Sequence, residues 1–237
     1  MRPQEIKKPQ EIKEQLKLLI EEASTIDPSL AIKLNQINNW IKDVRPGTLM
    51  SKRFVLLFLQ QFIQDTEIRL DINRLTSEAE RQDFYESMTP PERYWYGELF
   101  PRWLSKNDPK FHIWRKKLMS GEFNQEDEKL INLIADVIKL NGGQALQRYI
   151  IDLSMASDII VSSIQEQPLC IQLTSQSQEF TQAKSDDWEN TLISWGIARG
   201  LFLSFNPGES DFINQIVSLA LDKSDNLNNG IYQKINL

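Results

Sequence analysis

The sequence contains almost no cysteine or histidine. Its 237 residues include one cysteine, Cys170, and one histidine, His112. A single cysteine excludes a disulfide within the chain, and disulfides are typical of oxidising compartments. Because zinc sites built from Cys and His need three or four such ligands, a site of this kind within one chain is excluded as well. We expect both residues to be structural.

Long apolar runs are missing too. No stretch approaches the roughly 20 apolar residues that a membrane-spanning helix needs, and the opening MRPQEIKKPQEIK lacks the apolar segment of a secretory signal. We therefore expect a cytoplasmic protein without membrane association. Glycine motifs of the P-loop, the Rossmann fold and the hydrolase nucleophile elbow are not found. The composition, 41% apolar and 25% charged, is that of a globular protein with a real core.

Charge is unevenly divided along the chain. Residues 1–126 carry 20 Lys and Arg against 19 Asp and Glu, whereas residues 127–237 carry 7 against 14. An acidic second half does not attract a phosphate backbone, so charge does not favour nucleic-acid binding there. Such binding would have to come from a partner, from the N-terminal half or from a local patch. Arg115-Lys116-Lys117 is one such patch, with a solvated helix end as the alternative interpretation.

The first half is predicted to be helical. Apolar residues at helical spacing indicate helices over residues 11–20 and 28–41, the second beginning at Asp27-Pro28. The apolar run 54–63 favours a buried helix, with a strand as the alternative. Thr89-Pro90-Pro91-Glu92 has the pattern of a helix start, and a further short helix is indicated over 111–118. We predict an all-helical domain over residues 1–124, through which a protein partner could bind, and we expect its many aromatic residues to form core rather than a base-stacking surface.

The second half, residues 125–237, changes to a mixed pattern. A helix over 125–140, with Asn124 as its cap, is followed by strands at 145–151 and within 157–174. A helix at 185–195, a strand at 201–205, a last helix from Phe212 and a strand at 231–235 complete the order. Strands that are apolar on both faces indicate a sheet covered by helices on both sides. The predicted fold class is therefore α/β, with the helical domain in front.

Two polar residues stand out in the central hairpin. Asp158 opens one apolar strand and Gln172 interrupts the next, and a buried polar group is costly unless it has a partner. Because side chains alternate along a strand, the two share a face only if paired residue numbers sum to an even value. A register with Ile160 opposite Gln172 satisfies this condition. It places Asp158 opposite Thr174 and requires an odd-length loop, such as residues 164–168.

This layout resembles the restriction-endonuclease-like fold of the PD-(D/E)XK nuclease superfamily, and its Mrr-type branch most. The matching residues are Asp158-Ile159-Ile160-Val161 and Ile171-Gln172-Leu173-Thr174, within roughly 110 residues of similar element order. The resemblance implies a central mixed sheet flanked by helices. It also implies that Asp158 and Gln172 would hold Mg²⁺, with Thr174 at the position of the catalytic lysine.

The sequence departs from the motif at Thr174, which replaces the lysine, and at Gln172, which is neutral. Two charged residues could make up for these differences. Lys184, placed just before the following helix, would supply the lysine, and Glu179 a second carboxylate; the alternative is that both are solvated loop charges. For Gln172 and Thr174 the alternative is a leftover polar pair in a degenerate pocket, and for Asp158 a residue that starts a strand.

Three functions follow from these residues. The first-ranked is a catalytically impaired relative of the nucleases that serves as an interaction or nucleic-acid-associated module. The second is an active Mg²⁺-dependent DNA or RNA phosphodiesterase that uses Asp158, Gln172 and Lys184, in restriction or anti-phage defence. The third is a structural or oligomerising protein that shares only the fold.

Overall fold

The chain forms two compact units, each described here by itself. The computed structural model describes residues 7–121, 125–175 and 178–237, with backbone only for 125–127 and 178–182. Unit 1 comprises Met1–Ser87 and Pro101–Phe123, and unit 2 comprises Met88–Phe100 and Asn124–Leu237. Unit 2 thus begins near the predicted boundary at residue 124 but also takes in residues 88–100. None of the described helices is long and apolar enough to cross a membrane.

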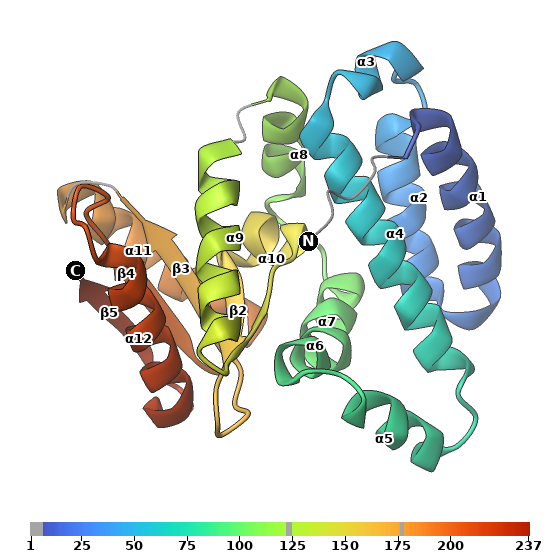
Figure 1. Ribbon diagram of the computed structural model, residues 1–237. Helices are drawn as coiled ribbons and strands as arrows, with labels where there is room; N and C mark the ends of the chain where they lie inside the picture. The colour runs from blue at the N-terminus through green and yellow to red at the C-terminus, as the bar shows by residue number, and fades with distance from the viewer. Residues whose placement is uncertain (1–6, 122–124, 176–177) are drawn as a thin grey trace. The chain divides into compact units, whose positions relative to one another are not determined.

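The described part of unit 1 is helical throughout (Figure 1). The predicted helices over 11–20, 28–41 and 111–118 are confirmed, and the ambiguous run 54–63 lies within a 22-residue helix. The elements of this unit are α1 (Pro9–Ile26), α2 (Pro28–Ile41), α3 (Pro46–Met50), α4 (Arg53–Arg74), α5 (Glu78–Glu86), most of α7 (Phe100–Ser105) and α8 (Phe111–Ser120).

Aromatic rings fill the interior of unit 1. The rings of Trp40, Phe58 and Trp114 lie 5.2 to 6.0 Å apart, centre to centre. The indole N–H groups of Trp103 and Trp114 donate to the buried carboxylate of Asp108 at 3.2 and 2.9 Å. These rings pack inward, so the prediction that the aromatic residues form core is confirmed.

Asp27 joins three helices of unit 1. It is the N-cap of α2, where it accepts a hydrogen bond from the Leu30 N–H at 3.1 Å. Its other oxygen accepts from Arg69 Nε at 3.0 Å and from Asn73 Nδ2 at 2.9 Å, both on α4. Burial raises the pKa of this carboxyl, but the hydrogen bonds and the Arg69 charge outweigh burial and leave the pKa below its ordinary value.

We expect Asp27→Asn to lower the free energy of unfolding by about 2 kcal/mol at pH 7, because the charge-assisted bonds to α4 are lost. A carboxyl whose pKa is depressed in the folded state stabilises above its unfolded pKa, near 3.8, and loses that contribution as pH falls further. The difference between wild type and variant, measured by urea unfolding, should therefore shrink below about pH 4. Asp71→Asn, which removes an exposed carboxylate paired with Arg74, is the control and should cost much less.

A helix with a widened turn carries the chain between the units. It begins with the predicted capping box at Thr89 as α6 (Pro90–Tyr94), continues as the π-helical segment η1 (Trp95–Leu99) and ends as α7. Pro101 has no N–H and its ring would clash with the carbonyl four residues earlier. The turn before it is accordingly wider, with the Phe100 N–H bonded to the Trp95 carbonyl.

Unit 2 is built on a mixed five-stranded sheet. The strands β1 (Gln144–Leu146), β2 (Ile159–Ser162), β3 (Leu169–Thr174), β4 (Gly200–Ser204) and β5 (Tyr232–Asn236) lie in sequence order. The first three are antiparallel neighbours, whereas β3, β4 and β5 are parallel. A sheet of mixed direction between helices agrees with the predicted α/β class.

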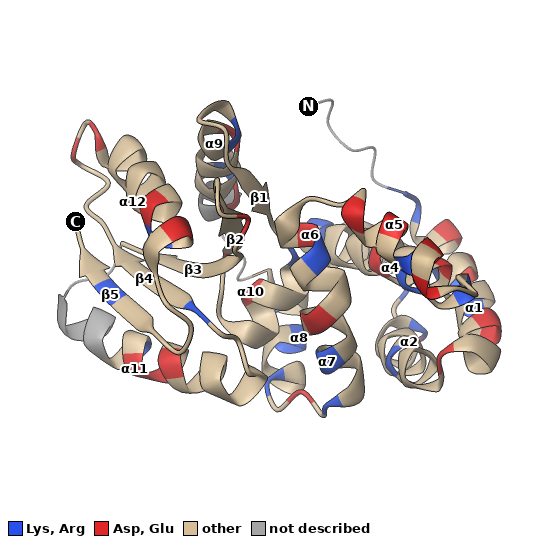
Figure 2. Ribbon diagram, turned by 90° about the horizontal axis from the view of Figure 1, so that it is seen from below, with Lys and Arg blue, Asp and Glu red and all other residues tan. Residues whose placement is uncertain are grey.

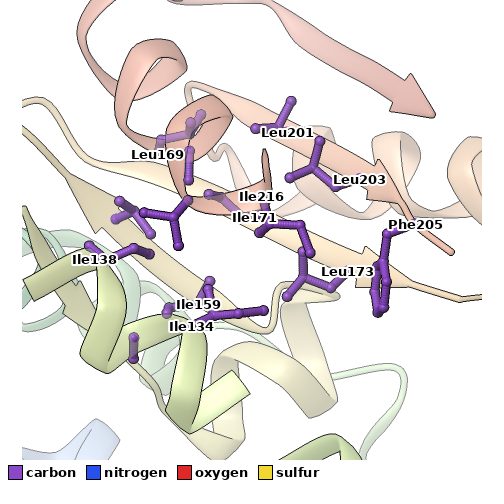
Figure 3. Packing of buried hydrophobic residues seen from close by; sticks show 14 of the residues in the cluster. Ile134, Ile138, Ile159, Leu169, Ile171, Leu173, Leu201, Leu203, Phe205 and Ile216 are labelled. Atoms are coloured by element: carbon purple, nitrogen blue, oxygen red, sulfur yellow. The ribbon is translucent and has the colours of Figure 1, made fainter. Parts of the chain in front are cut away.

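Helices cover both faces of this sheet. Figure 2 shows α9 (Gln125–Leu140) and α12 (Phe212–Asn226) on one side, and α10 (Tyr149–Met155) and α11 (Gln178–Trp195) on the other. On the α9 and α12 side the strands contribute a continuous apolar layer (Figure 3). On the other side Trp188 of α11 packs edge-on against Phe202 of β4, with ring centres 5.5 Å apart. The central strand β3 is consequently buried along its whole length.

Two elements differ from their predictions. The strand expected over residues 145–151 ends at Leu146, and Ile150 and Ile151 lie in α10 instead. An apolar run this short does not distinguish a strand from one turn of buried helix. The helix expected to begin at Ser185 begins seven residues earlier, at Gln178, because a polar first stretch carries no apolar periodicity. The proposed cap Asn124 lies outside the described residues.

Arg199 holds one end of the sheet together. Only 3% of its surface is exposed, and its guanidinium donates to main-chain carbonyls of three residues, two at the end of α12 and one just before β3. Nη1 bonds Ser224 O at 3.0 Å and Leu227 O at 2.8 Å, while Nη2 bonds Pro168 O at 2.9 Å. Burial lowers the pKa of this guanidinium. The charge is accommodated because the planar fork of donors satisfies several carbonyls at once.

Candidate functional site

The hairpin formed by β2 and β3 brings the predicted acid and amide together. The observed register pairs Ile160 with Cys170, so the expected pairing of Ile160 with Gln172 is wrong by two residues. A shift of two keeps the same side chains on the same face, because the pleat repeats every two residues. Continued by one pair, the observed register sets Asp158 opposite Gln172 rather than Thr174.

One oxygen of Asp158 accepts two short hydrogen bonds across the hairpin. The Gln172 amide Nε2 donates to Asp158 Oδ2 at 2.6 Å, and so does the Leu173 main-chain N–H at 2.6 Å. The same Nε2 also lies 3.2 Å from Leu173 O. Gln172 is 8% exposed, so these contacts satisfy a polar group that has little access to water. The carboxylate thus ties the start of β2 to the end of β3.

A row of polar side chains continues from this pair across the sheet. Thr174 pairs with Ser204 of β4, and Ser204 with Asn236 of β5. Because paired residues share a face, all three lie on the α11 side together with Gln172. Thr174 and Ser204 are 5% and 4% exposed. Sequence reasoning found Thr174 but not Ser204 or Asn236, although Ser204 interrupts the apolar run of β4 just as Gln172 interrupts β3.

Lys184 lies inside α11 rather than before it, so its predicted place ahead of the helix is wrong. It is half-buried and one helical turn before Trp188, on the same side of the helix. Trp188 packs over Phe202, two residues before Ser204. One turn of helix and two residues of strand cover nearly the same length, about 6 Å. The backbone of Lys184 is thereby placed over the row of Thr174 and Ser204, and no described carboxylate forms an ion pair with it.

The ligand set offered by these residues is poor for a divalent cation. Mg²⁺ prefers oxygen ligands and usually one or two carboxylates, whereas here one carboxylate oxygen is bonded by two N–H groups. No cluster of three or more His, Cys, Asp or Glu suited to a metal occurs in the part of the chain that the structure describes. The side chain of Glu179 lies outside the described residues. The site as built does not fit Mg²⁺.

Other candidate features lie elsewhere. Shallow hollows of about 470 and 430 Å³ run along α12, on the opposite face of the sheet from Gln172. Cys170 is fully buried, and burial raises the pKa of its thiol to about 12, against smaller opposing effects of Ser157 and Arg199. A thiol in that state is not a nucleophile. His112 is exposed on α8.

No protein-family model, curated protein or solved structure matches this chain. The site therefore has to be interpreted from its own geometry.

Removing the carboxylate tests the bond between the strands. We expect Asp158→Ala to lower the free energy of unfolding by about 2 to 3 kcal/mol, because the Gln172 amide and the Leu173 N–H lose their acceptor. In a double-mutant cycle with Gln172→Met, the two changes should cost about 1 to 2 kcal/mol less than their sum. Denaturant unfolding of the four proteins measures this coupling. Additive costs would show that the two side chains do not interact.

Proposed function

We propose that unit 2 is a nuclease-like domain whose catalytic site is impaired, and that the protein acts as an interaction module rather than as a nuclease. The proposal rests on the hydrogen bonds that the Asp158 carboxylate accepts. Its Oδ2 accepts from the Gln172 amide and from the Leu173 N–H. An oxygen engaged by two donors stabilises the hairpin, and a metal ion would have to displace both.

The topology supports kinship with the restriction-endonuclease-like fold. A helix precedes three antiparallel neighbours, and a crossover through α11 adds a parallel strand. The acid stands at the start of β2 and the amide near the end of β3, in the order that the motif requires. Thr174 occupies the lysine position and brings no positive charge to stabilise a developing negative charge.

The second candidate is an active phosphodiesterase, and the position of Lys184 favours it. A half-turn of the Gln172 amide would direct its oxygen, rather than its nitrogen, toward the space beside Asp158. A lysine from α11 above Thr174 and Ser204 would then supply the missing charge. This candidate ranks below the first because it needs both rearrangements, and because residues 127–237 carry 7 basic against 14 acidic side chains.

Nuclease assays separate the two candidates. We expect no cleavage of supercoiled plasmid, single-stranded DNA or RNA with Mg²⁺ or Mn²⁺, and identical gels for wild type and Asp158→Ala. Calorimetric titration with Mg²⁺ should show no heat of binding in either protein. Cleavage that disappears in Asp158→Ala would contradict the impaired-site proposal and would identify the protein as a phosphodiesterase.

Restoring the motif tests the kinship itself. The double substitution Gln172→Glu and Thr174→Lys recreates the acid and lysine of the superfamily on the face that already carries Asp158. Two carboxylates at hydrogen-bond distance repel each other, so without a metal the variant should unfold several degrees below wild type. We expect about 10 mM Mg²⁺ to recover most of that loss, because the ion now has two carboxylate ligands.

The control for that experiment is Gln144→Glu, which adds a carboxylate at an exposed position of β1, away from Asp158. Its melting temperature should not respond to Mg²⁺. If the double variant also shows no response, the paired side chains of Asp158 and Gln172 are not a degenerate metal site, and the kinship loses its support.

A further inference from the structure

The charges of unit 1 are separated along its length. At one end lie seven basic residues from the end of α2, the turns on either side of α3, the start of α4 and the middle of α8, here called the basic end. They are Lys42, Arg45, Lys52, Arg53, Arg115, Lys116 and Lys117. Asp43 is the one carboxylate within these stretches. Most other acidic residues of unit 1 lie toward the other end of α4 and along α5, where Figure 2 shows red segments. Glu11 and Glu14 of α1 are exceptions, because Lys13 between them donates to Lys42 O and Val44 O at the basic end.

Ring contacts join the two parts of the basic end. Trp114 of α8 lies 5.9 Å from Trp40 at the end of α2 and 5.2 Å from Phe58 in the second turn of α4. Arg115, Lys116 and Lys117 follow Trp114 directly. Lys42 comes two residues after Trp40, and Figure 1 shows α3, the start of α4 and α8 at the same end of the unit. The seven residues therefore belong to one end of one compact body.

Their charges are not neutralised. None of the seven forms an ion pair with a carboxylate in the described ranges, whereas Arg69, Arg74 and Arg81 in the rest of unit 1 each form at least one. Exposed cations held close together without counter-charges repel one another. An arrangement that lowers stability in this way is explained if an anionic partner supplies the missing charges.

The start of α4 adds to the positive field. This 22-residue helix begins at Arg53, and its N-cap residue Lys52 provides no side-chain oxygen to the free main-chain N–H groups. The N-terminus of a helix carries about half a positive charge. Here that partial charge coincides with Lys52 and Arg53, so side-chain and main-chain donors reinforce each other.

We propose that the basic end of unit 1 binds the phosphate backbone of a nucleic acid. Several separated cations on a rigid surface suit the regularly spaced charges of such a backbone. A membrane surface is less suited, because interfacial proteins place aromatic and apolar anchors beside their basic residues. Here the rings of Phe58 and Trp114 are 1% and 2% exposed and point into the core, and the large apolar side chains exposed beside the basic residues, Met50 and Ile113, are not aromatic. The basic end would provide the affinity for nucleic acid that the acidic unit 2 lacks, and it does not depend on the nuclease kinship.

The test measures binding of the full chain to fluorescein-labelled 25-nucleotide DNA, as duplex and as single strand, and to RNA of the same length. Fluorescence anisotropy is recorded between 50 and 200 mM salt. We expect binding that weakens steeply with salt and does not depend on sequence. Arg45→Gln with Arg53→Gln, and separately Lys116→Gln with Lys117→Gln, should each weaken binding roughly ten- to fiftyfold and reduce the salt slope by about two.

The matched control is Lys129→Gln with Lys139→Gln, which removes two exposed lysines from α9. It should change binding less than threefold, and circular dichroism should show all variants folded. None of these substitutions lies at the candidate site of unit 2, so a failure of the nuclease kinship leaves this result unchanged. The proposal is overturned if wild type binds no nucleic acid at 50 mM salt, if the control loses as much affinity as the other pairs, or if the protein binds only phosphatidylserine vesicles.

Discussion

The central strand of unit 2, β3, is covered on both faces, and this burial determines the role of the Asp158 carboxylate. Every side chain of β3 is buried, so polar groups within it must find their partners inside the protein. The Gln172 amide donates to Asp158 Oδ2, and the main-chain N–H of Leu173 donates to the same oxygen. Arg199 meets the same constraint at the opposite end of the sheet, where its guanidinium donates to carbonyls rather than to a carboxylate. Both side chains connect segments of unit 2 by hydrogen bonds in addition to the strand ladder and the apolar packing.

Much of this architecture could be predicted from the sequence, and the failures have physical reasons. Helices marked by proline, a cap and apolar periodicity, such as α2, were found to within a residue or two. The shared face of Asp158 and Gln172 was predicted correctly, because side chains alternate along a strand and a shift of two residues leaves each on the same face. The register itself was not, because it depends on how the loop after Ser162 closes. The polar first turns of α11 and the short run in α10 lacked a periodic signal. Ser204 and Asn236 were missed because their relation to Thr174 depends on parallel pairing across distant segments.

The two units divide the charge of the chain in a way that bears on function. Unit 2 combines a buried polar row with an excess of acidic residues, whereas unit 1 carries 19 Lys and Arg against 16 Asp and Glu. A protein that cleaves nucleic acid normally concentrates positive charge around its catalytic groups. Here the candidate site and the unneutralised cations reside in different units. The two proposals accordingly assign the nuclease-like site to one unit and the contact with nucleic acid to the other.

The path of the chain through residues 88–100 has one more consequence. These residues belong to unit 2, yet residues 101–105, which complete the same helical stretch, belong to unit 1. Tyr94, Trp95 and Tyr96 are nearly fully buried, and Tyr96 accepts a hydrogen bond from Arg148 at 3.0 Å. No single cut of the polypeptide therefore yields both bodies intact. A fragment starting at residue 125 would lack the rings of Tyr94, Trp95 and Tyr96. Recombination or splitting of the gene at that point would therefore remove part of the interior of unit 2.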